Sequence, residues 1–541
     1  MLKGLMISNW FGTQKSSPAR GTWLYLPAAL VALAMTLPLI YLLIRAAGAG
    51  SAAWSWLLRL QTLQIIGQSV GLALAVMLAA FIIGLPTAWL VTRTNLPGKT
   101  LWAALLPLPL VIPSYVSAYL FVSLFAPRGL LQNLLEGWLG VERLPSIYGF
   151  WGAWLVLTLM TYPYVFLAVR AGLIRTDRSL EEAARSLGHS AWQTFWKVTF
   201  TQLRPALAAS SLLVGLYVLR DFGAVSILRF TTFTRAIYLQ YQSSIDRSAA
   251  ALLSLVLVLI TIGFLVGEQR IRRSSAEQPY TAVHPAPPVD LGRWRVAAIV
   301  MIIFVLLGGL ILPAGVLFYW LVRGLAAGEQ ISGWLRPLTG SLTAAGLAAV
   351  ITVIAALPAS LLSVRRPGFF SQLIEKWSYL GYALPGVVIA LSLVFLGANH
   401  LRLMYQTLFM LLLAYVILFL PQAVGNLQVA LRQVQPSLEE AAASLGHSPL
   451  RIFRRITLPL VMPGVSSAAA LVFLTAMKEL PATLLLAPTG FSTLATQVWG
   501  AVSEAYFARA AAPALILILI SSISIMLINH HTSYEGSAKR T

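Results

Sequence analysis

The sequence contains no cysteine, and only 10% of its 541 residues are charged. The absence of cysteine excludes disulfide bonds, thiolate nucleophiles and cysteine-ligated metal sites. Soluble domains carry roughly 25% charged residues, so this charge content argues against a soluble fold. Instead, 58% of the residues are hydrophobic, and they form many apolar runs about 20 residues long, the length that crosses a bilayer. The composition therefore predicts a membrane protein with many spans.

Acidic residues are also scarce, with 17 Asp and Glu against 38 Lys and Arg, which leaves a formal net charge of +21. In a soluble protein this excess would point to nucleic acid. In a membrane protein, basic residues of the cytoplasmic loops fix the orientation of the chain. We therefore expect both termini in the cytoplasm and no nucleic-acid partner. On that topology the basic loops around Arg93 and Lys99 and within 170–197, 270–295, 365–376 and 451–455 are all cytoplasmic.

The apolar runs form two sets of six, and an even number of spans returns the chain to its starting side. We predict an all-α polytopic membrane protein with about 12 transmembrane helices in two parallel six-helix repeats. The predicted spans are 24–44, 65–90, 101–125, 150–168, 206–228, 249–266, 296–321, 342–362, 377–396, 408–424, 465–486 and 510–528. The predicted divisions are a cytoplasmic tail (1–22), a first half (23–269), a cytoplasmic linker (270–295), a second half (296–529) and a cytoplasmic tail (530–541).

A polar dodecapeptide occurs twice, as SLEEAARSLGHS from Ser179 and as SLEEAAASLGHS from Ser437. Each copy lies in a predicted cytoplasmic loop between the fourth and fifth spans of its half. The serines suit helix N-caps, and the glutamates three residues later would complete capping boxes. We predict a capped helix, a sharp turn at a glycine and a second helix in each loop.

The two copies match more closely than a simple connector requires, because a connector needs only polar residues and caps. The glycines Gly188 and Gly446 are 258 positions apart (446 − 188), close to half the chain. Small side chains would let another protein approach closely, which favours a docking surface. The alanines concerned are Ala183, Ala184, Ala441 and Ala442.

EAARSLG (182–188) and EAAASLG (440–446) resemble the EAA loop of ABC-importer permeases, in which Glu-Ala-Ala and a glycine precede Ile-x-Leu-Pro. We call 179–205 and 437–463 the first and second EAA loops. The second loop completes the pattern with Ile456, Leu458 and Pro459, whereas the first has Val198, Phe200 and Thr201 and lacks the final proline. Pro205 and Pro463 still align, and we expect a helix break there before each fifth span.

The resemblance implies that each EAA loop forms a coupling helix seated on a separate cytoplasmic ABC ATPase, two copies of which would use ATP and magnesium. Glu182 and Glu440 are the expected contacts to basic residues of that subunit. The lookalike phosphate loop NLPGKT has Arg93 where the first glycine belongs, so we expect no ATP site, cofactor or enzymatic activity in this chain.

Charged residues occupy matching places in the fifth spans, in VLRDFGAVSILRF and AMKELPATLLLAP. Arg220 corresponds to Lys478, and Asp221 corresponds to Glu479. Charges within a span are costly and usually face a cavity or a partner. They would line or gate a pathway between the halves. Alternatively, each half pairs its own neighbouring charges, or the charged residues lie near the outer interface and snorkel.

DFGAVSILRF, TFTRAIY and KELPATLLLAPTGFSTLATQVW resemble permeases of the ferric-iron import family. The resemblance implies a type I importer fold in the bacterial inner membrane, with iron(III) delivered by a periplasmic or lipid-anchored binding protein. Thiamine, polyamine, sulfate and phosphonate permeases share this architecture and remain alternatives.

Two other classes fit the sequence less well. An ion-coupled secondary transporter needs a titratable relay, for which Asp221 and Glu479 are the only starting points, and it does not need duplicated docking helices. A membrane enzyme needs a catalytic constellation, and none is evident. We expect no metal site: the adjacent His530 and His531 point about 100° apart on a helix, and a conductor must release its cargo.

Overall fold

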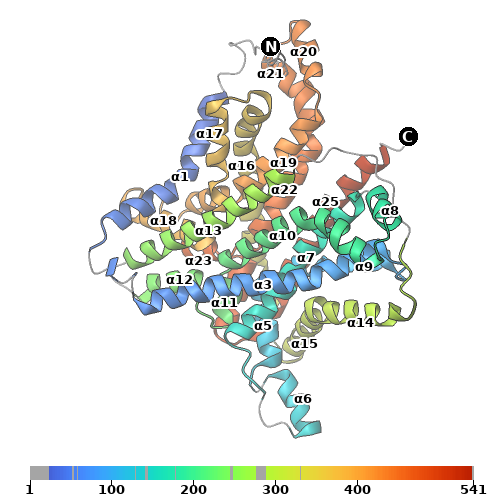
Figure 1. Ribbon diagram of the computed structural model, residues 1–541. Coiled ribbons are helices and arrows are strands. Elements are labelled where there is room, and N and C mark those ends of the chain that lie inside the picture. Colours follow the sequence, from blue (N-terminus) through green and yellow to red (C-terminus); the bar gives the residue numbers. More distant parts are fainter. Residues whose placement is uncertain are drawn as a thin grey trace.

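The computed structural model describes residues 24–50, 54–55, 57, 59–127, 129–140, 144–176, 178–243, 248–275, 288–328 and 331–538. Across these ranges the regular elements are helices, apart from one isolated bridge between Thr94 and Val289 (Figure 1). The tail at 1–22 and linker residues 276–287, which include His284, lie outside the described residues, as do the side chains of His530 and His531. The predicted all-α fold class is confirmed.

The helices of the first half are α1 (Tyr25–Ala47), α3 (Leu60–Arg93), α4 (Lys99–Leu105), η2 (Leu108–Val111), α5 (Ser114–Phe125), α6 (Leu130–Leu139), α7 (Phe150–Arg175), α8 (Arg178–Ser186), α9 (Ala191–Thr194), η3 (Phe195–Thr199), α10 (Phe200–Arg220), α11 (Gly223–Ile227), α12 (Phe233–Ser243) and α13 (Ser248–Ser275).

The helices that follow are η4 (Gly292–Trp294), α14 (Arg295–Leu306), η5 (Leu307–Ile311), α15 (Leu312–Ala326), η6 (Ile331–Trp334), α16 (Leu335–Arg365), α17 (Phe369–Ser378), η7 (Leu380–Tyr382), α18 (Gly386–Asn399), α19 (Leu408–Gln433), α20 (Pro436–Ser444), α21 (Pro449–Ile452), η8 (Phe453–Thr457), α22 (Leu458–Met477), α23 (Pro481–Leu486), α24 (Leu494–Ser503) and α25 (Phe507–Ala538).

The described residues supply apolar segments for all the predicted spans. Nine helical stretches are long and apolar enough to cross a membrane, and two bent pairs of helices would each form one more span. The remaining segment is the described apolar part of α25, Phe507–Ser522.

The third span of each half is bent, which corrects the predicted straight spans at 101–125 and 377–396. The two arms meet at 92° in the first half and at 104° in the second. These arms are Lys99–Val111 with Ser114–Gly137, and Phe369–Tyr382 with Gly386–Asn399. Pro113 or Pro385 immediately precedes the second arm, and a proline disfavours helical backbone in the residue before it. Each bend therefore leaves irregular backbone at membrane depth, which must be buried in protein.

The predicted helix breaks at Pro205 and Pro463 are wrong. Both prolines lie inside continuous helical segments, Ala191–Arg220 and Pro449–Met477. Each of these segments contains a single turn of π-helix, η3 or η8, before the proline. Membrane helices tolerate proline because neighbouring helices and local π adjustments satisfy the freed backbone groups. The chain instead breaks at the far end of each segment, where α11 or α23 follows.

The first span of each half packs against the other half (Figure 1). Helix α1 lies along α16, α17 and α18, and it also meets α13. Its buried face carries Ala28, Ala32 and Met35, and small side chains allow such close approach between membrane helices. Helix α15 in turn packs against α5 of the first half as well as α25. The two halves are therefore interlocked rather than merely adjacent.

Close packing of α22 on α19 predicts that Gly464→Ala destabilises the protein. A Cβ at position 464 would lie 2.2 Å from the Cβ of Ala430, and overpacking of this kind costs about 1–3 kcal/mol. The midpoint of thermal unfolding in detergent should fall. The matched control is Gly346→Ala on α16, where a Cβ meets nothing within 4 Å. Equal midpoints for the two variants would contradict the packing described.

Candidate functional site

The two EAA loops have the same backbone. In each, the predicted first helix, glycine turn and second helix are present, as α8 and α9 or as α20 and α21. Gly188 has φ +86° and Gly446 has φ +82°, a conformation that glycine adopts at little cost. Two hydrogen bonds close each turn, from the glycine N–H and from the N–H of the following histidine, as in a Schellman motif. In the second loop they reach Ala443 O at 3.0 Å and Ala442 O at 3.2 Å.

The predicted serine caps are wrong. Helix α20 has Gln435 at its N-cap position, without a side-chain cap hydrogen bond, and Pro436 at its first position, so Ser437 lies within the helix. Helix α8 likewise begins before Ser179. The capping box belongs to the second helix of the first loop. There Ser190 Oγ accepts from Gln193 N at 3.3 Å, and Gln193 Oε1 accepts from Ser190 N at 3.1 Å.

Only part of the predicted docking surface is accessible. Glu182, Ala183, Glu440 and Ala441 are exposed, whereas Ala184 and Ala442 are buried against their own chain. The small side chains at the buried positions let α8 and α20 pack on the remainder of their own EAA loops, rather than on another protein. Sequence reasoning missed two exposed apolar side chains beside these residues: Leu187 is 81% exposed and Leu445 is 80% exposed.

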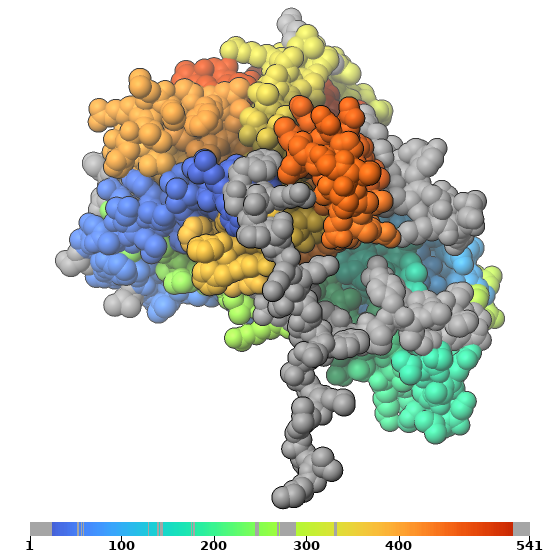
Figure 2. Space-filling model, turned by 90° about the horizontal axis from the view of Figure 1, so that it is seen from above, coloured from blue at the N-terminus to red at the C-terminus, as the bar shows by residue number. Residues whose placement is uncertain are grey.

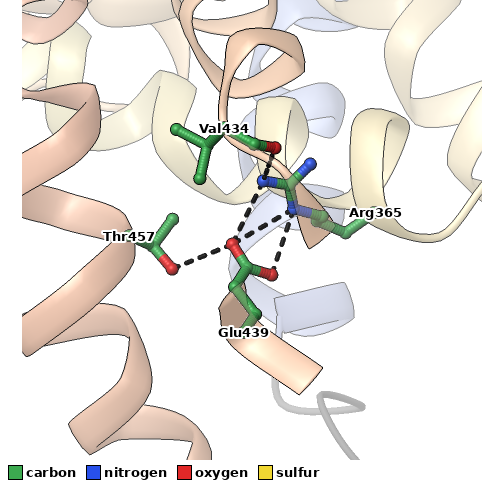
Figure 3. A network of polar contacts seen from close by, with 4 residues as sticks. All are labelled: Arg365, Val434, Glu439 and Thr457. Carbon is green, nitrogen blue, oxygen red and sulfur yellow. Dashed lines mark hydrogen bonds and ion pairs between the residues drawn. The ribbon is translucent and has the colours of Figure 1, made fainter. Parts of the chain in front are cut away.

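A carboxylate holds the second EAA loop to the membrane helices (Figure 3). Glu439 in α20 accepts hydrogen bonds from Arg365 Nε at 3.1 and 3.2 Å and from Arg365 Nη2 at 3.1 Å. Thr457 Oγ1 donates to the same carboxylate at 2.9 Å. The Arg365 guanidinium also donates to Val434 O at 3.1 Å. Such charge-assisted, multiply bonded contacts are stronger than neutral hydrogen bonds and fix geometry.

The first EAA loop repeats this arrangement. Arg93 Nη2 lies 2.9 Å from Glu181 Oε1, and Thr199 Oγ1 donates to the same oxygen at 2.9 Å. Arg93 also donates to Thr176, whose position corresponds to that of Val434 (434 − 176 = 258). We call Arg93–Glu181–Thr199 and Arg365–Glu439–Thr457 the first and second anchors. Each anchor joins the end of the second span, the first helix of the loop and the π turn before the fifth span.

The residues of the Ile-x-Leu-Pro pattern surround the second anchor. Ile456 and Leu458 are half-buried on either side of the buried Thr457, and Pro459 is exposed at the start of α22. In the first loop Val198 and Phe200 flank Thr199 with the same burial, and Thr201 is exposed. Both loops form the π turn, at Phe195–Thr199 and Phe453–Thr457. The proline missing from the first loop therefore does not change its exit geometry.

The acidic residues of the fifth spans cap the short helices that follow the break. Asp221 Oδ1 accepts from Ala224 N at 3.0 Å, and Glu479 Oε1 accepts from the matching Ala482 N at 3.1 Å. Ser114 Oγ also donates to Asp221. Within the described residues neither acid forms an ion pair with the basic residue beside it. The alternative of neighbouring charges that neutralise each other is thus not what the structure contains.

The basic residues of the fifth spans face the opposite half. Lys478 Nζ donates to Leu110 O at 3.0 Å, in the bend of the first half's third span. Arg220 lies within electrostatic range of Glu479 and Tyr382 of the second half and of Tyr164 of its own half. Tyr382 corresponds to Leu110 by the offset that relates Arg365 to Arg93 (272). The bend of the first half is therefore contacted by the fifth-span cation of the second half. Among the described residues no three His, Asp or Glu side chains gather as metal ligands would.

Comparisons with known proteins agree with the internal repeat. Residues 80–274 and 348–532 each match the family described as "Binding-protein-dependent transport system inner membrane component". The sequence is 36% identical to the Fe(3+)-transport system permease protein FbpB 2 of Haemophilus influenzae, over 94% of this chain and 98% of that relative. It is 25% identical to the ferric transport system permease protein FbpB of Actinobacillus pleuropneumoniae, over 86% and 71% respectively. The molybdenum transport system permease protein ModB of Escherichia coli is 30% identical over 39% of this chain and 95% of its own length.

The second anchor predicts a specific loss of order when its carboxylate is removed. Glu439→Ala should weaken the attachment of residues 437–457 by about 2 kcal/mol, since hydrogen bonds to charged groups contribute roughly that much and the paired side chains are only 17% and 22% exposed. Amide hydrogen exchange across the loop measures the effect. Glu440→Ala, which alters the adjacent exposed carboxylate, is the control and should leave exchange unchanged. Equal exchange in both variants would argue against the anchor.

Proposed function

Because the chain belongs to the family of binding-protein-dependent transport system inner membrane components, we propose that it is the permease of an ATP-driven importer of iron(III). The observation that carries the choice of cargo is the 36% identity to an Fe(3+)-transport permease along nearly the whole length of both chains. The molybdenum permease matches a much smaller share of this chain, so it supports the architecture rather than a cargo. Both halves of the pathway belong to one polypeptide.

The two EAA loops are the proposed seats of two copies of a cytoplasmic ABC ATPase, which would use ATP and magnesium while this chain catalyses no reaction. The loops form two separate projections on the surface, orange and blue-green in Figure 2. Each presents an exposed leucine, Leu187 or Leu445, beside an exposed carboxylate, Glu182 or Glu440. An exposed apolar side chain beside a carboxylate suits an apolar groove on the ATPase with basic residues at its rim.

The proposed orientation places these loops and both termini in the cytoplasm of a bacterium. The remaining partners follow from this orientation. The opposite end of the molecule would then receive a substrate-binding protein, periplasmic or lipid-anchored. Helices α12 and α24 lie there in matching positions, after the break of each fifth span. We place the chain in the inner membrane, with lipid around its exposed apolar helix faces.

The pathway is proposed to open where the fifth-span cations face the opposite half. Relative motion of the halves would separate Lys478 from Leu110 and Arg220 from Glu479. The carboxylate of Asp221 already accepts two backbone N–H groups and the Ser114 hydroxyl, so it offers a passing cation few free lone pairs. Weak contacts with the cargo suit a conductor, because tight binding would prevent release.

The cargo is tested by ATP hydrolysis, measured with this chain reconstituted beside its ATPase. We expect stimulation by an iron(III)-loaded binding protein and none by the same protein without iron. Binding proteins loaded with molybdate, sulfate, thiamine or a polyamine are the matched alternatives. Stimulation by one of those, and not by the ferric protein, would retain the permease and reject iron(III) as its cargo.

The docking surface predicts that Leu445→Lys reduces association with the ATPase by about tenfold or more, the effect of about 1.4 kcal/mol. Burial of an unpaired lysine would oppose seating of the loop. The control is Leu403→Lys, which alters a leucine that is 98% exposed in the loop between α18 and α19. Copurification with the ATPase is the readout, and equal yields for the two variants would exclude Leu445 from the contact.

The glycine turn predicts that Gly446→Asp abolishes transport while the protein still inserts into the membrane. A residue with a Cβ is strained at φ +82° by roughly 1–2 kcal/mol, so α20 and α21 would change their relative direction. Membrane fractionation and ATP-dependent uptake measure the two effects. Uptake at the normal rate would contradict a role for the turn in coupling.

A further inference from the structure

An apolar groove of about 490 Å³ lies between the end of α3 and the start of α14, next to the first anchor. Trp89 of α3 and Trp294, the residue directly before α14, each contribute an indole. The groove is lined by Pro86, Trp89, Leu90, Val289, Asp290, Leu291, Trp294, Ala297, Ala298 and Met301. Neither docking of the ATPase nor passage of the cargo accounts for it.

The end of the groove is built by a fixed segment of the linker. Val289 N donates to Arg93 O at 2.7 Å, and Asn95 N donates to Val289 O at 3.1 Å. The Asn95 side chain adds two hydrogen bonds, to Asp290 Oδ1 at 2.7 Å and from Leu291 N at 3.1 Å. These bonds tie the linker to the residues that directly follow the arginine of the first anchor. The groove wall is therefore held in place rather than formed by a loose loop.

The internal repeat shows how such a groove is otherwise filled. Helices α16 and α17 correspond to α3 and α4, and α1 packs closely along both of them. Helix α14 meets α3 only sparsely. Its Val296 and Val300 are exposed, as is Trp294 directly before it. In the second half, α1 fills the space beside the second span, α16. In the first half, α14 leaves the corresponding space beside α3 open.

The charges at the mouth of the groove favour an anion. Arg293 and Arg295 are exposed on either side of Trp294. The one acid, Asp290, is engaged by Gly292 N at 3.1 Å as well as by Asn95, and these hydrogen bonds hold its pKa below the usual value. Arg295 lies 4.0 Å from it, and Arg293 is a second exposed cation in the same segment, so two cations stand against one carboxylate that is already engaged. Tryptophan beside arginine is typical of the membrane interface.

We propose that this groove binds an anionic phospholipid, with an acyl chain along α3 and α14 and the head-group phosphate at Arg293 and Arg295. Basic pockets between membrane helices on the cytoplasmic side recognise such head groups. The bound lipid would brace the linker against the exit of α3 and so stabilise the first anchor. The second anchor has no equivalent linker contact within the described residues, so the two EAA loops would respond differently to lipid.

Native mass spectrometry of the full chain, released from nanodiscs of phosphatidylglycerol or of phosphatidylcholine, tests the proposal. We expect one phosphatidylglycerol to be retained and phosphatidylcholine to be lost. Ala297→Trp, which fills the groove, and the double variant Arg293→Gln/Arg295→Gln, which removes the charge, should each lower retention by about tenfold. Val300→Trp alters the same helix outside the groove and is the control.

Equal retention in all variants, or equal retention of the two lipids, would overturn the proposal. The orientation of the chain decides only which leaflet supplies the lipid. Because the measurement involves neither iron nor ATP, its outcome is independent of whether the proposed cargo is correct.

Discussion

A single carboxylate ties each EAA loop to the membrane helices. This carboxylate accepts hydrogen bonds from an arginine and from a threonine that belong to two different elements. In the second half Glu439 is held by Arg365 at the end of α16 and by Thr457 in the π turn before α22. Two short rigid turns, the glycine turn and the π turn, leave the loop little freedom around that point. Through these contacts, a force applied to α20 would be passed to the second and fifth spans together.

The same constraint recurs in the first half, and the two halves are not independent bodies. Helix α1 packs on the second half, and Lys478 reaches the bend of the first half's third span. The irregular backbone of that bend is paired across the interface, which is how non-helical segments are tolerated at membrane depth. The two loops lie apart on the surface while the halves meet at the centre, so opposite motions of the loops would converge on the cross-half contacts.

The class, the repeat, the all-helical fold and the glycine turns could be predicted because they depend on composition and on short motifs. The anchors could not. Glu181 and Glu439, rather than Glu182 and Glu440, face inward, and that choice depends on arginines 88 and 74 residues earlier in the chain. The packing of α1 depends on a surface of the other half. The first bend has a local signal in the sequence, the cluster of prolines within 107–113. The second bend has only Pro385 beside it, which is a far weaker signal.

Coupling through the anchors is tested most directly by the iron(III) imported per ATP hydrolysed by the reconstituted transporter. We predict that Glu181→Gln with Glu439→Gln lowers this ratio, because the ATPase still docks but its motion no longer reaches the spans. Glu182→Gln with Glu440→Gln, one position further along each helix, should weaken association with the ATPase and leave the ratio unchanged. An unchanged ratio in the first pair would contradict the transmission of motion through the anchors.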